Sequence, residues 1–422
     1  MSLGIDIGTT SIKICLNLPT QSNNIMSLRI SGQMHGIMLW NSSITRKVEK
    51  YSNLITWMDE RCDENFILEI KKQIGEHLKI SKGYGLATLL WLTKYKLDYV
   101  KEFNRCGTIM DFICCYLKNN FDETFITDQN AVSWGLFNEI KNNFDLEILS
   151  KIFPNNFFND IITLPKVIEA NYLIGKTTET FSIFGIPNDI QIKASLGDLQ
   201  ASLSIVSIKT PVLFIIIGTS AQISFILPDT LDNVKNLQKN NLLIRNKFIP
   251  NFSAWTGALM NGGNTLEKIV NLICNLYFDI VSLDDDEKQK IKEKVCWEKL
   301  LNIQPNINQL KTNSLSFEKL FLEERSNEIV QDKHLHNGLV VFAYKIVENM
   351  HNIISTTTLF SMGISKMILI GKANTPLFKN LIMNFYKNQS ILELKDLYPN
   401  SISIDSSLGS AVFDEVIFSN NF

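Results

Sequence analysis

The strongest constraint on the fold is a short pattern that occurs twice, at the start and near the middle of the 422-residue chain. Each copy consists of an apolar, β-branched segment, a turn containing Gly and Thr, and a second apolar segment; the copies lie at residues 3–14 and 211–226. Apolar arms around such a turn predict a β-hairpin. A pattern that recurs at half the chain length predicts two related α/β domains, which we place at residues 1–208 and 209–422.

The turn of each hairpin is a candidate phosphate site. Glycine permits a tight backbone there, and successive N–H groups can surround an anion. The candidate phosphate-binding residues are Gly8, Thr9, Thr10, Gly218, Thr219 and Ser220. An ordinary hairpin turn uses the same residue types, so the pattern alone leaves both interpretations open.

The two copies differ at one position that bears on metal binding. Asp6 precedes the first turn, whereas Ile216 stands at the corresponding place in the second. Asp6 is our candidate ligand for Mg²⁺, and we expect it to bind through water because Mg²⁺ keeps much of its hydration shell. A carboxylate in a strand can also simply pair or cap. Two phosphate turns with one metal-facing carboxylate fit phosphoryl transfer from a metal–nucleotide complex.

Composition excludes several classes of function. The net charge is −2, and no basic run interleaved with aromatic residues is present, so we expect no nucleic-acid partner. No apolar run is long enough to span a bilayer, and the N-terminus does not resemble a secretory signal. The seven cysteines and five histidines show no metal-ligand spacing, so we expect no zinc site and reduced thiols in a cytoplasmic protein.

Asp198 is the candidate general base. It follows a predicted strand over residues 190–194 and precedes a predicted helix that begins at Leu199. The local sequence favours an N-cap role equally. The two roles are compatible, because a helix N-terminus keeps a carboxylate ionised.

Six segments occur in the order that is typical of FGGY carbohydrate kinases, and the chain resembles this family over nearly its whole length. The segments are residues 5–10, 31–36, 57–61, 197–200, 218–220 and 261–264. The resemblance implies two actin/hexokinase-like (ribonuclease H-like) domains, each with a mixed sheet flanked by helices. It also implies a ligand cleft between them, with the sugar and phosphate on the N-terminal side and the nucleotide on the C-terminal side.

The same resemblance assigns roles to individual residues. Asp198 is then the base and also a sugar contact, and the other sugar contacts are Gln33, Met34, His35, Asp59, Arg61, Asp128 and Asn130. The nucleotide contacts are Thr9, Thr10, Thr219, Gly262, Gly263, Gly371 and Ala373.

Each sugar-contact assignment has a structural alternative. The Met34–His35 pair could be core, although the flanking glycines predict an exposed turn. Asp59 and Arg61 could form a plain surface ion pair at the start of a helix that runs to about Ile74. Asp128 and Asn130 could be turn-forming residues.

The chain departs from the family pattern in two places. The connection between Cys15 and Leu28 is too short for the strands and helix that the family inserts there, so the first domain is expected to be truncated and to leave an apolar sheet face uncovered. The second departure is the segment 371–374, where Ala373 stands among residues that are usually glycine-rich. It puts nucleotide affinity in question.

The leading hypothesis is an ATP- and Mg²⁺-dependent ketose kinase, with sedoheptulose ahead of xylulose or ribulose. Its partners would be the sugar and ATP, and the protein would be a monomer or homodimer. Two alternatives stay open. One is a catalytically weakened relative that binds sugar or nucleotide and has a regulatory role; the other is an actin-like filament or chaperone.

Overall fold

The computed structural model describes most of the chain, and the statements below concern the described residues. These are residues 2–8, 12–17, 25–43, 50–75, 79–178, 187–206, 208–218, 220–259, 262, 266–268, 270–271, 274–275, 278, 284–293, 301–302, 332–398 and 406–418. The chain divides into two compact units. Unit 1 comprises residues 1–208, 246–253 and 402–422, and unit 2 comprises residues 209–245 and 254–401.

The described part of unit 1 combines short strands with helices. Its strands are β1 (Ser2–Ile7), β2 (Ile12–Asn17), β3 (Ser27–Gly32), β4 (Met38–Trp40), β5 (Arg105–Gly107), β6 (Phe125–Thr127), β7 (Phe137–Asn138), β8 (Asn143–Phe144), β9 (Lys166–Ile168), β10 (Leu173–Lys176) and β11 (Gln191–Gly197). Its helices are α1 (Glu64–Ile74), α2 (Gly85–Tyr95), α3 (Leu97–Val100), α4 (Ile109–Lys118), α5 (Asp128–Trp134), α6 (Leu146–Ile152), α7 (Phe157–Asp160), α8 (Asp198–Leu203) and α19 (Ser406–Phe418).

The central sheet of unit 1 has the strand order β10-β11-β3-β1-β2. The predicted N-terminal hairpin is confirmed, because β1 and β2 pair antiparallel. Strands β1, β3 and β11 run parallel, and their ends are in register: Ile7 lies opposite Gly32, which lies opposite Gly197. The segments that follow these three residues therefore leave the same edge of the sheet, where parallel sheets place their ligands.

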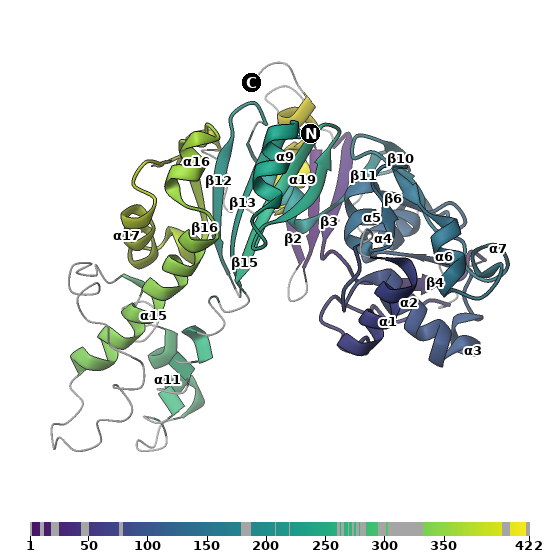
Figure 1. Ribbon diagram of the computed structural model, residues 1–422, viewed down its shortest axis with the longest axis horizontal. Coiled ribbons are helices and arrows are strands. Elements are labelled where there is room, and N and C mark those ends of the chain that lie inside the picture. Colours follow the sequence, from purple (N-terminus) through teal and green to yellow (C-terminus); the bar gives the residue numbers. More distant parts are fainter. Residues whose placement is uncertain are drawn as a thin grey trace. The chain divides into compact units, whose positions relative to one another are not determined.

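One helix covers each face of this sheet. On one face the C-terminal helix α19 packs against β1, β2 and β3, and Figure 1 shows it beside these purple strands. The approach at Gly4 is so close that a Cβ there would lie 2.0 Å from the Ser407 carbonyl oxygen. On the other face α4 contributes Met110 and Cys114 to a core with Leu28 and Ile30.

Among the described residues the sheet ends at β2, as the short connection after Cys15 predicts. In unit 2 the corresponding strand, β13, has a further neighbour in its sheet, whereas β2 is an edge strand. Its side chains Ile12, Ile14 and Leu16 remain 67%, 67% and 42% exposed. The expected uncovered apolar face is thus present on the described part of β2.

Unit 2 is built around a second mixed sheet. Its strands are β12 (Val212–Ile217), β13 (Ala221–Pro228), β14 (Ile244–Ile249), β15 (Phe252–Leu259), β16 (Lys366–Gly371) and β17 (Ser390–Ile391), in the order β14-β15-β13-β12-β16-β17. Its helices are α9 (Leu231–Gln238), α11 (Asp285–Lys290), α15 (Asp332–Ile353), α16 (Thr356–Ser361), α17 (Pro376–Phe385) and α18 (Leu394–Leu397), with a 3₁₀ turn η3 (Lys372–Asn374).

The second predicted hairpin is also confirmed, since β12 and β13 pair antiparallel. Strand β16 lies parallel to β12 on the other side, with Gly371 opposite Ile217. The helices α15 and α17 pack together and fill the core beside this sheet with residues such as Val347, Leu377 and Phe378. Both units therefore have the hairpin that the half-chain repeat predicted, and in both a parallel strand lies beside it.

Two predicted helix boundaries were wrong. The helix expected to begin around Asp59 begins only at Glu64, because Asp63 caps it by accepting a hydrogen bond from the Phe66 N–H. The cap of α8 is Gly197 rather than Asp198, which is the first helical residue. The stop predicted at Gly75 is correct, and this residue has a φ of 80°.

Candidate functional site

The two carboxylates singled out by the sequence lie at the same edge of the unit 1 sheet. Asp6 is in register with Ser31 of β3, and the Ser31 hydroxyl donates to its Oδ1 at 3.0 Å. Asp198 comes directly after Gly197, the last residue of β11. A Cβ at Gly197 would lie 2.4 Å from Gln200 Oε1 and 2.7 Å from the sulfur of Met34, so only glycine lets these segments approach.

The electrostatics of Asp198 suit a general base near neutral pH. Its side chain is partly buried, and its Oδ1 accepts a 2.7 Å hydrogen bond from the Leu199 N–H. Burial, together with the negative charge of Asp6, raises the pKa of Asp198 to about 7. A carboxylate with this pKa accepts a proton far more readily than an exposed one, while half or more remains ionised above pH 7.

The turn predicted to contact the sugar is buried, so the expectation of an exposed turn was wrong. Gln33 and Met34 are 4% and 7% exposed, and His35 is half-buried. The glycines permit close packing here rather than exposure: a Cβ at Gly36 would lie 2.8 Å from the Ile55 carbonyl oxygen.

His35 is fixed in an unusual conformation. Its φ is 74°, which non-glycine residues adopt at an energetic cost, mostly at functional sites. Its ring stacks on Tyr84 at 4.6 Å, and its Nδ1 lies 2.5 Å from the Ser133 carbonyl oxygen. A carbonyl only accepts, so Nδ1 carries the proton. Burial lowers the pKa of His35, which leaves Nε2 as an acceptor on a neutral ring.

Asp128 and Asn130 are not turn-forming residues, because both lie in the first turn of α5 and are almost fully buried. Asp128 accepts from the Gln129 N–H at 2.9 Å and pairs with Lys247 Nζ at 2.9 Å. Asn130 donates to Ser195 Oγ at 3.5 Å. Two residues away from Ser195 along β11 lies Gly197, so α5 adjoins the segment that carries Asp198.

Asp59 and Arg61 bind each other. The Asp59 carboxylate accepts from Arg61 Nε at 2.6 Å and from Nη2 at 2.9 Å. Partial burial acts to raise the pKa of Asp59, but the hydrogen bonds from Arg61 outweigh it and the pKa is lowered overall. The pair lies in a turn before α1, not at its start, and its predicted contact with sugar remains a prediction.

In unit 2, the predicted phosphate and nucleotide residues that the structure describes lie close together. Gly218 and Ser220 form the turn after β12, with the Gly218 N–H donating to the Ser220 carbonyl at 2.9 Å. A Cβ at Gly262 would lie 2.3 Å from the Ser220 carbonyl carbon, and one at Gly371 would lie 2.7 Å from the Ile217 oxygen. The space beside Gly218 is open, which suits a phosphate-binding turn.

Ala373 fits its position without strain. It lies in the 3₁₀ turn η3 and is fully buried. Among the described residues, the positive φ in this segment is that of Gly371, at 66°. The family's additional glycine is therefore not needed by this backbone. Thr9, Thr10, Thr219 and Gly263 lie outside the described residues, and their predicted roles stay predictions.

The donor set at Asp6 fits the magnesium prediction rather than a protein-enclosed metal. Within the described ranges no three His, Cys, Asp or Glu side chains gather as a metal site. Asp6 and Asp198 supply carboxylate oxygens at one edge, and Mg²⁺ is typically bound by one or two carboxylates together with water and substrate phosphates.

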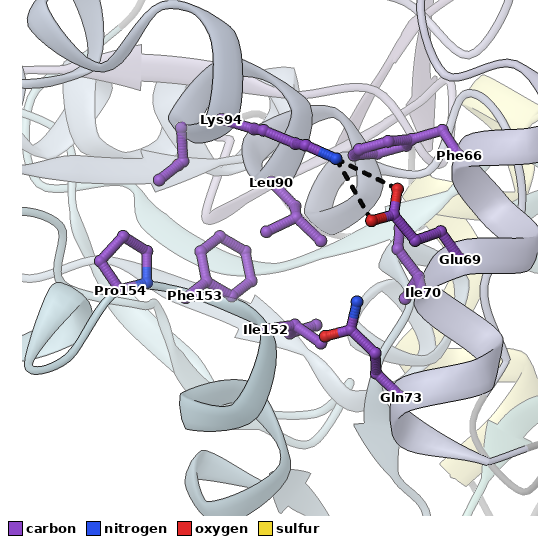
Figure 2. A pocket seen from close by; sticks show the side chains of 10 residues that line it. Phe66, Glu69, Ile70, Gln73, Leu90, Lys94, Ile152, Phe153 and Pro154 are labelled. Atoms are coloured by element: carbon purple, nitrogen blue, oxygen red, sulfur yellow. Dashed lines mark hydrogen bonds and ion pairs between the residues drawn. The ribbon is translucent and has the colours of Figure 1, made fainter.

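A pocket of about 390 Å³ in unit 1 lies among elements that the sequence did not single out (Figure 2). Its apolar floor includes Phe66, Leu90 and Phe153, and at its rim Lys94 Nζ donates to the Glu69 carboxylate. These charges neutralise each other, and none of the predicted site residues lines the pocket.

Sequence reasoning missed several polar residues of the site. Ser31 bonds Asp6, Ser195 bonds Asp111 at 2.9 Å, and Lys247 pairs with Asp128. Ser31 and Gln200 lie in segments of the family pattern, whereas Lys247 lies in none of these segments and approaches α5 only through tertiary folding. The tip of the β14–β15 hairpin, residues 246–253, carries Lys247 and belongs to unit 1.

Comparison with known proteins identifies the N-terminal part of the chain. Residues 17–204 match the FGGY family of carbohydrate kinases, N-terminal domain. This part is therefore similar to the N-terminal domain of these kinases. The match begins after the hairpin that carries Asp6 and ends soon after α8.

Relatives of known name extend the similarity to most of the chain. It is 28% identical to the sedoheptulokinase of Mus musculus over 85% of this chain and 76% of the relative. It is 27% identical to the sedoheptulokinase of Homo sapiens over 84% and 74%. Together with the family match, these relatives show that most of the chain is similar to sugar kinases.

The fold is shared with solved FGGY-type kinases. A xylulose kinase from Rhodospirillum rubrum superposes with a TM-score of 0.63 at 12% identity, covering 98% of this chain and 89% of that one. The predicted actin/hexokinase-like α/β fold with mixed sheets is thus confirmed. Within the described residues, no helix has both the length and the apolar character needed to cross a membrane.

Proposed function

We propose that this FGGY kinase transfers the γ-phosphoryl group of ATP to a ketose, with sedoheptulose as the preferred substrate and Asp198 as the general base. The observation that carries the proposal is the placement of Asp198 beside Asp6 at the edge where β1, β3 and β11 end. The two sedoheptulokinase relatives support the choice of sugar.

The proposed mechanism assigns one task to each group. The acceptor hydroxyl of the sugar donates its proton to the Asp198 carboxylate as its oxygen attacks the γ-phosphorus of ATP. The bond between this phosphorus and the bridging oxygen to the β-phosphate breaks, and ADP leaves. The turn 33–36 and the start of α5 orient the sugar, and in unit 2 the backbone at Gly218, Gly262 and Gly371 receives the nucleotide. Asp6 would bind Mg²⁺ through water, and this ion would neutralise charge on the transferring phosphoryl group.

Little basicity is required of Asp198, because the phosphoryl transition state is loose and the proton leaves late. Positioning and charge neutralisation account for most of the rate, while a placed base contributes about 10²–10⁴-fold. This division predicts that substitutions at Asp198 reduce kcat and leave nucleotide affinity nearly unchanged.

The experiment is ADP release from purified protein with sedoheptulose, xylulose and ribulose, for the wild type and Asp198→Asn. We expect sedoheptulose to give the highest kcat/KM, and the substitution to lower kcat by at least about 10²-fold. Turnover that no ketose raises above the ATPase background, and that Asp198→Asn leaves unchanged, would refute the proposal.

The alternative of a catalytically weakened relative rests on the truncated first domain. The open edge at β2 supports it, but the truncation spares both Asp6 and Asp198. Sugar binding without sugar-dependent ADP release would favour that alternative. We also propose a cytoplasmic location, which the thiol state of the six described cysteines supports.

A further inference from the structure

Four buried side-chain amides of unit 1 have oxygens without a hydrogen-bond partner. They belong to Gln33, Gln129, Asn130 and Gln200. An unsatisfied buried acceptor costs free energy, so four of them in one unit require an explanation such as a bound polar group. All four residues lie in the sugar-contact turn or in the first turns of α5 and α8.

The orientation of two of these amides is fixed by carbonyl partners. Gln129 Nε2 donates to the Phe248 carbonyl oxygen, and Gln200 Nε2 donates to the Lys247 carbonyl oxygen at 3.4 Å. Since a carbonyl oxygen only accepts, each NH₂ group must face the β14–β15 hairpin. The free atom of each amide is therefore its oxygen.

Asn130 is oriented by the same logic through Ser195. The Ser195 hydroxyl donates to Asp111 Oδ1 at 2.9 Å, which leaves its oxygen to accept from Asn130 Nδ2. His35 adds a further acceptor, because its Nδ1 donates to Ser133 and its Nε2 does not carry the proton. This part of unit 1 thus presents acceptors and needs a ligand that supplies donors.

Lys247 is the residue that connects the helices carrying these acceptors. Its Nζ lies 2.9 Å from Asp128 Oδ2 at the start of α5 and also donates to Asn142 Oδ1. Its backbone carbonyl oxygen accepts a hydrogen bond from Gln200 Nε2 of α8. The Lys247 side chain is 20% exposed and that of Asp128 is 3% exposed, so this ion pair is largely shielded from water.

We propose that Lys247 is a specificity-determining residue that positions α5 and α8 for a neutral polyhydroxy sugar; this inference rests on the proposed function and deepens it. Hydroxyl groups can donate to the free oxygens of Gln129, Asn130 and Gln200. The carboxylate of a sugar acid or the phosphate of a sugar phosphate has no hydrogen to donate, so its oxygens would repel these acceptors. The charge of Lys247 is neutralised by Asp128 and does not attract such anions.

The test compares Lys247→Met and Lys247→Arg with a matched control, Lys94→Met. Lys94 also forms an ion pair in unit 1, with Glu69 at 3.1 Å, but it lies at the pocket of Figure 2. We expect Lys247→Met to raise the KM for sedoheptulose about 10-fold or more, with kcat changed less than about 3-fold. The KM should recover largely in Lys247→Arg and stay at the wild-type value in Lys94→Met.

A second readout is independent of turnover: the rise in Tm that sedoheptulose or gluconate produces in the full-length protein. We expect a rise with sedoheptulose in the wild type, a smaller rise in Lys247→Met, and none with gluconate. An unchanged KM and an unchanged Tm shift in Lys247→Met would overturn the inference and leave the kinase proposal standing. A wild type that sedoheptulose stabilises but does not turn over would refute the proposed function, and the Tm comparison would still decide the role of Lys247.

Discussion

Asp198 and Asp6 act on each other although Asp6 lies in strand β1 and Asp198 at the start of helix α8. The pKa of Asp198 is raised to about 7, first by burial and then by the charge of Asp6. A base is active only when ionised, so the pKa of Asp198 sets the lowest pH at which the reaction runs at full rate.

We therefore expect log kcat/KM to rise with pH at unit slope and to level above about pH 7. Asp6→Asn removes a negative charge, which lowers the pKa of Asp198 and shifts this limb to lower pH, in addition to any loss of rate from weaker metal binding. The pH profiles of both proteins measure this shift. A wild-type kcat/KM that already levels near pH 4, or profiles that level at the same pH in both proteins, would contradict the account.

The raised pKa of Asp111 leads us to expect a pH dependence of stability rather than of activity. Burial raises its pKa to about 7, while Thr108 and Ser195 hydrogen bonds act in the opposite direction. Between its unfolded pKa near 4 and pH 7, the folded state binds more protons than the unfolded state. The free energy of unfolding should accordingly fall as pH rises through this window, by at most about 1.4 kcal/mol per pH unit from this residue.

Asp111→Asn should reduce that slope, because asparagine does not titrate. The slope is obtained from urea unfolding at several pH values between 4 and 7. Because Asp198 titrates in the same range, the contribution of Asp111 is the difference between the slopes of wild type and variant. Equal slopes in the two proteins would show that Asp111 is ionised throughout.

At the scale of the element, α19 shows how the end of the chain completes the first unit. Arg29 of β3 is fully buried, with Nη2 at 2.5 Å from Asp414 Oδ1 and its guanidinium 4.6 Å from the centre of the Phe413 ring. Its Nη1 also donates to the carbonyl oxygens of Ala170 and Ala194. One side chain thus joins α19, β3 and β11.

Asp414→Asn should therefore be costly, because it leaves the Arg29 charge buried without a counter-ion. Asp414 itself is 40% exposed, so water screens part of this loss, and we expect a decrease of about 2 kcal/mol in the free energy of unfolding by urea. Asp122→Asn is the matched control, since Asp122 pairs with Arg105 but is 72% exposed, and it should cost at most about 1 kcal/mol. Equal losses in the two variants would contradict the role assigned to Arg29.

The edge strand β2 leads to a prediction about association. Ile14 is 67% exposed on a strand with an open edge, and such surfaces favour aggregation. Ile14→Thr should increase the soluble fraction on concentration, measured by light scattering, and change the free energy of unfolding by less than about 0.5 kcal/mol. Destabilisation by several kcal/mol would instead mean that this face is covered.

At the scale of the whole molecule, the half-chain repeat with its apolar arms predicted both hairpins correctly, and the family resemblance predicted the mixed α/β sheets. Local patterns suffice there because the β-hairpin is a local structure. They failed where tertiary packing decides. Glycines around residues 33–36 predicted exposure, but the turn is buried against residue 55 and α5.

The site was predictable only in part for the same reason. Asp6 and Asp198 stand beside turns and helix starts that the sequence reveals. Lys247 reaches Asp128 from a distant hairpin, and no spacing rule connects the two residues. The amide orientations of Gln129 and Gln200 depend on backbone carbonyls of that hairpin, which a sequence pattern does not specify.

The most direct test of the central claim follows the γ-phosphoryl group itself. ATP labelled with ³²P at the γ position is incubated with the protein, Mg²⁺ and sedoheptulose, and the labelled products are separated. The account predicts that label appears in a sugar phosphate in equal amount to the ADP formed, and that Asp198→Asn nearly abolishes this transfer. Label found only in inorganic phosphate, at a rate that sedoheptulose does not change, would contradict it.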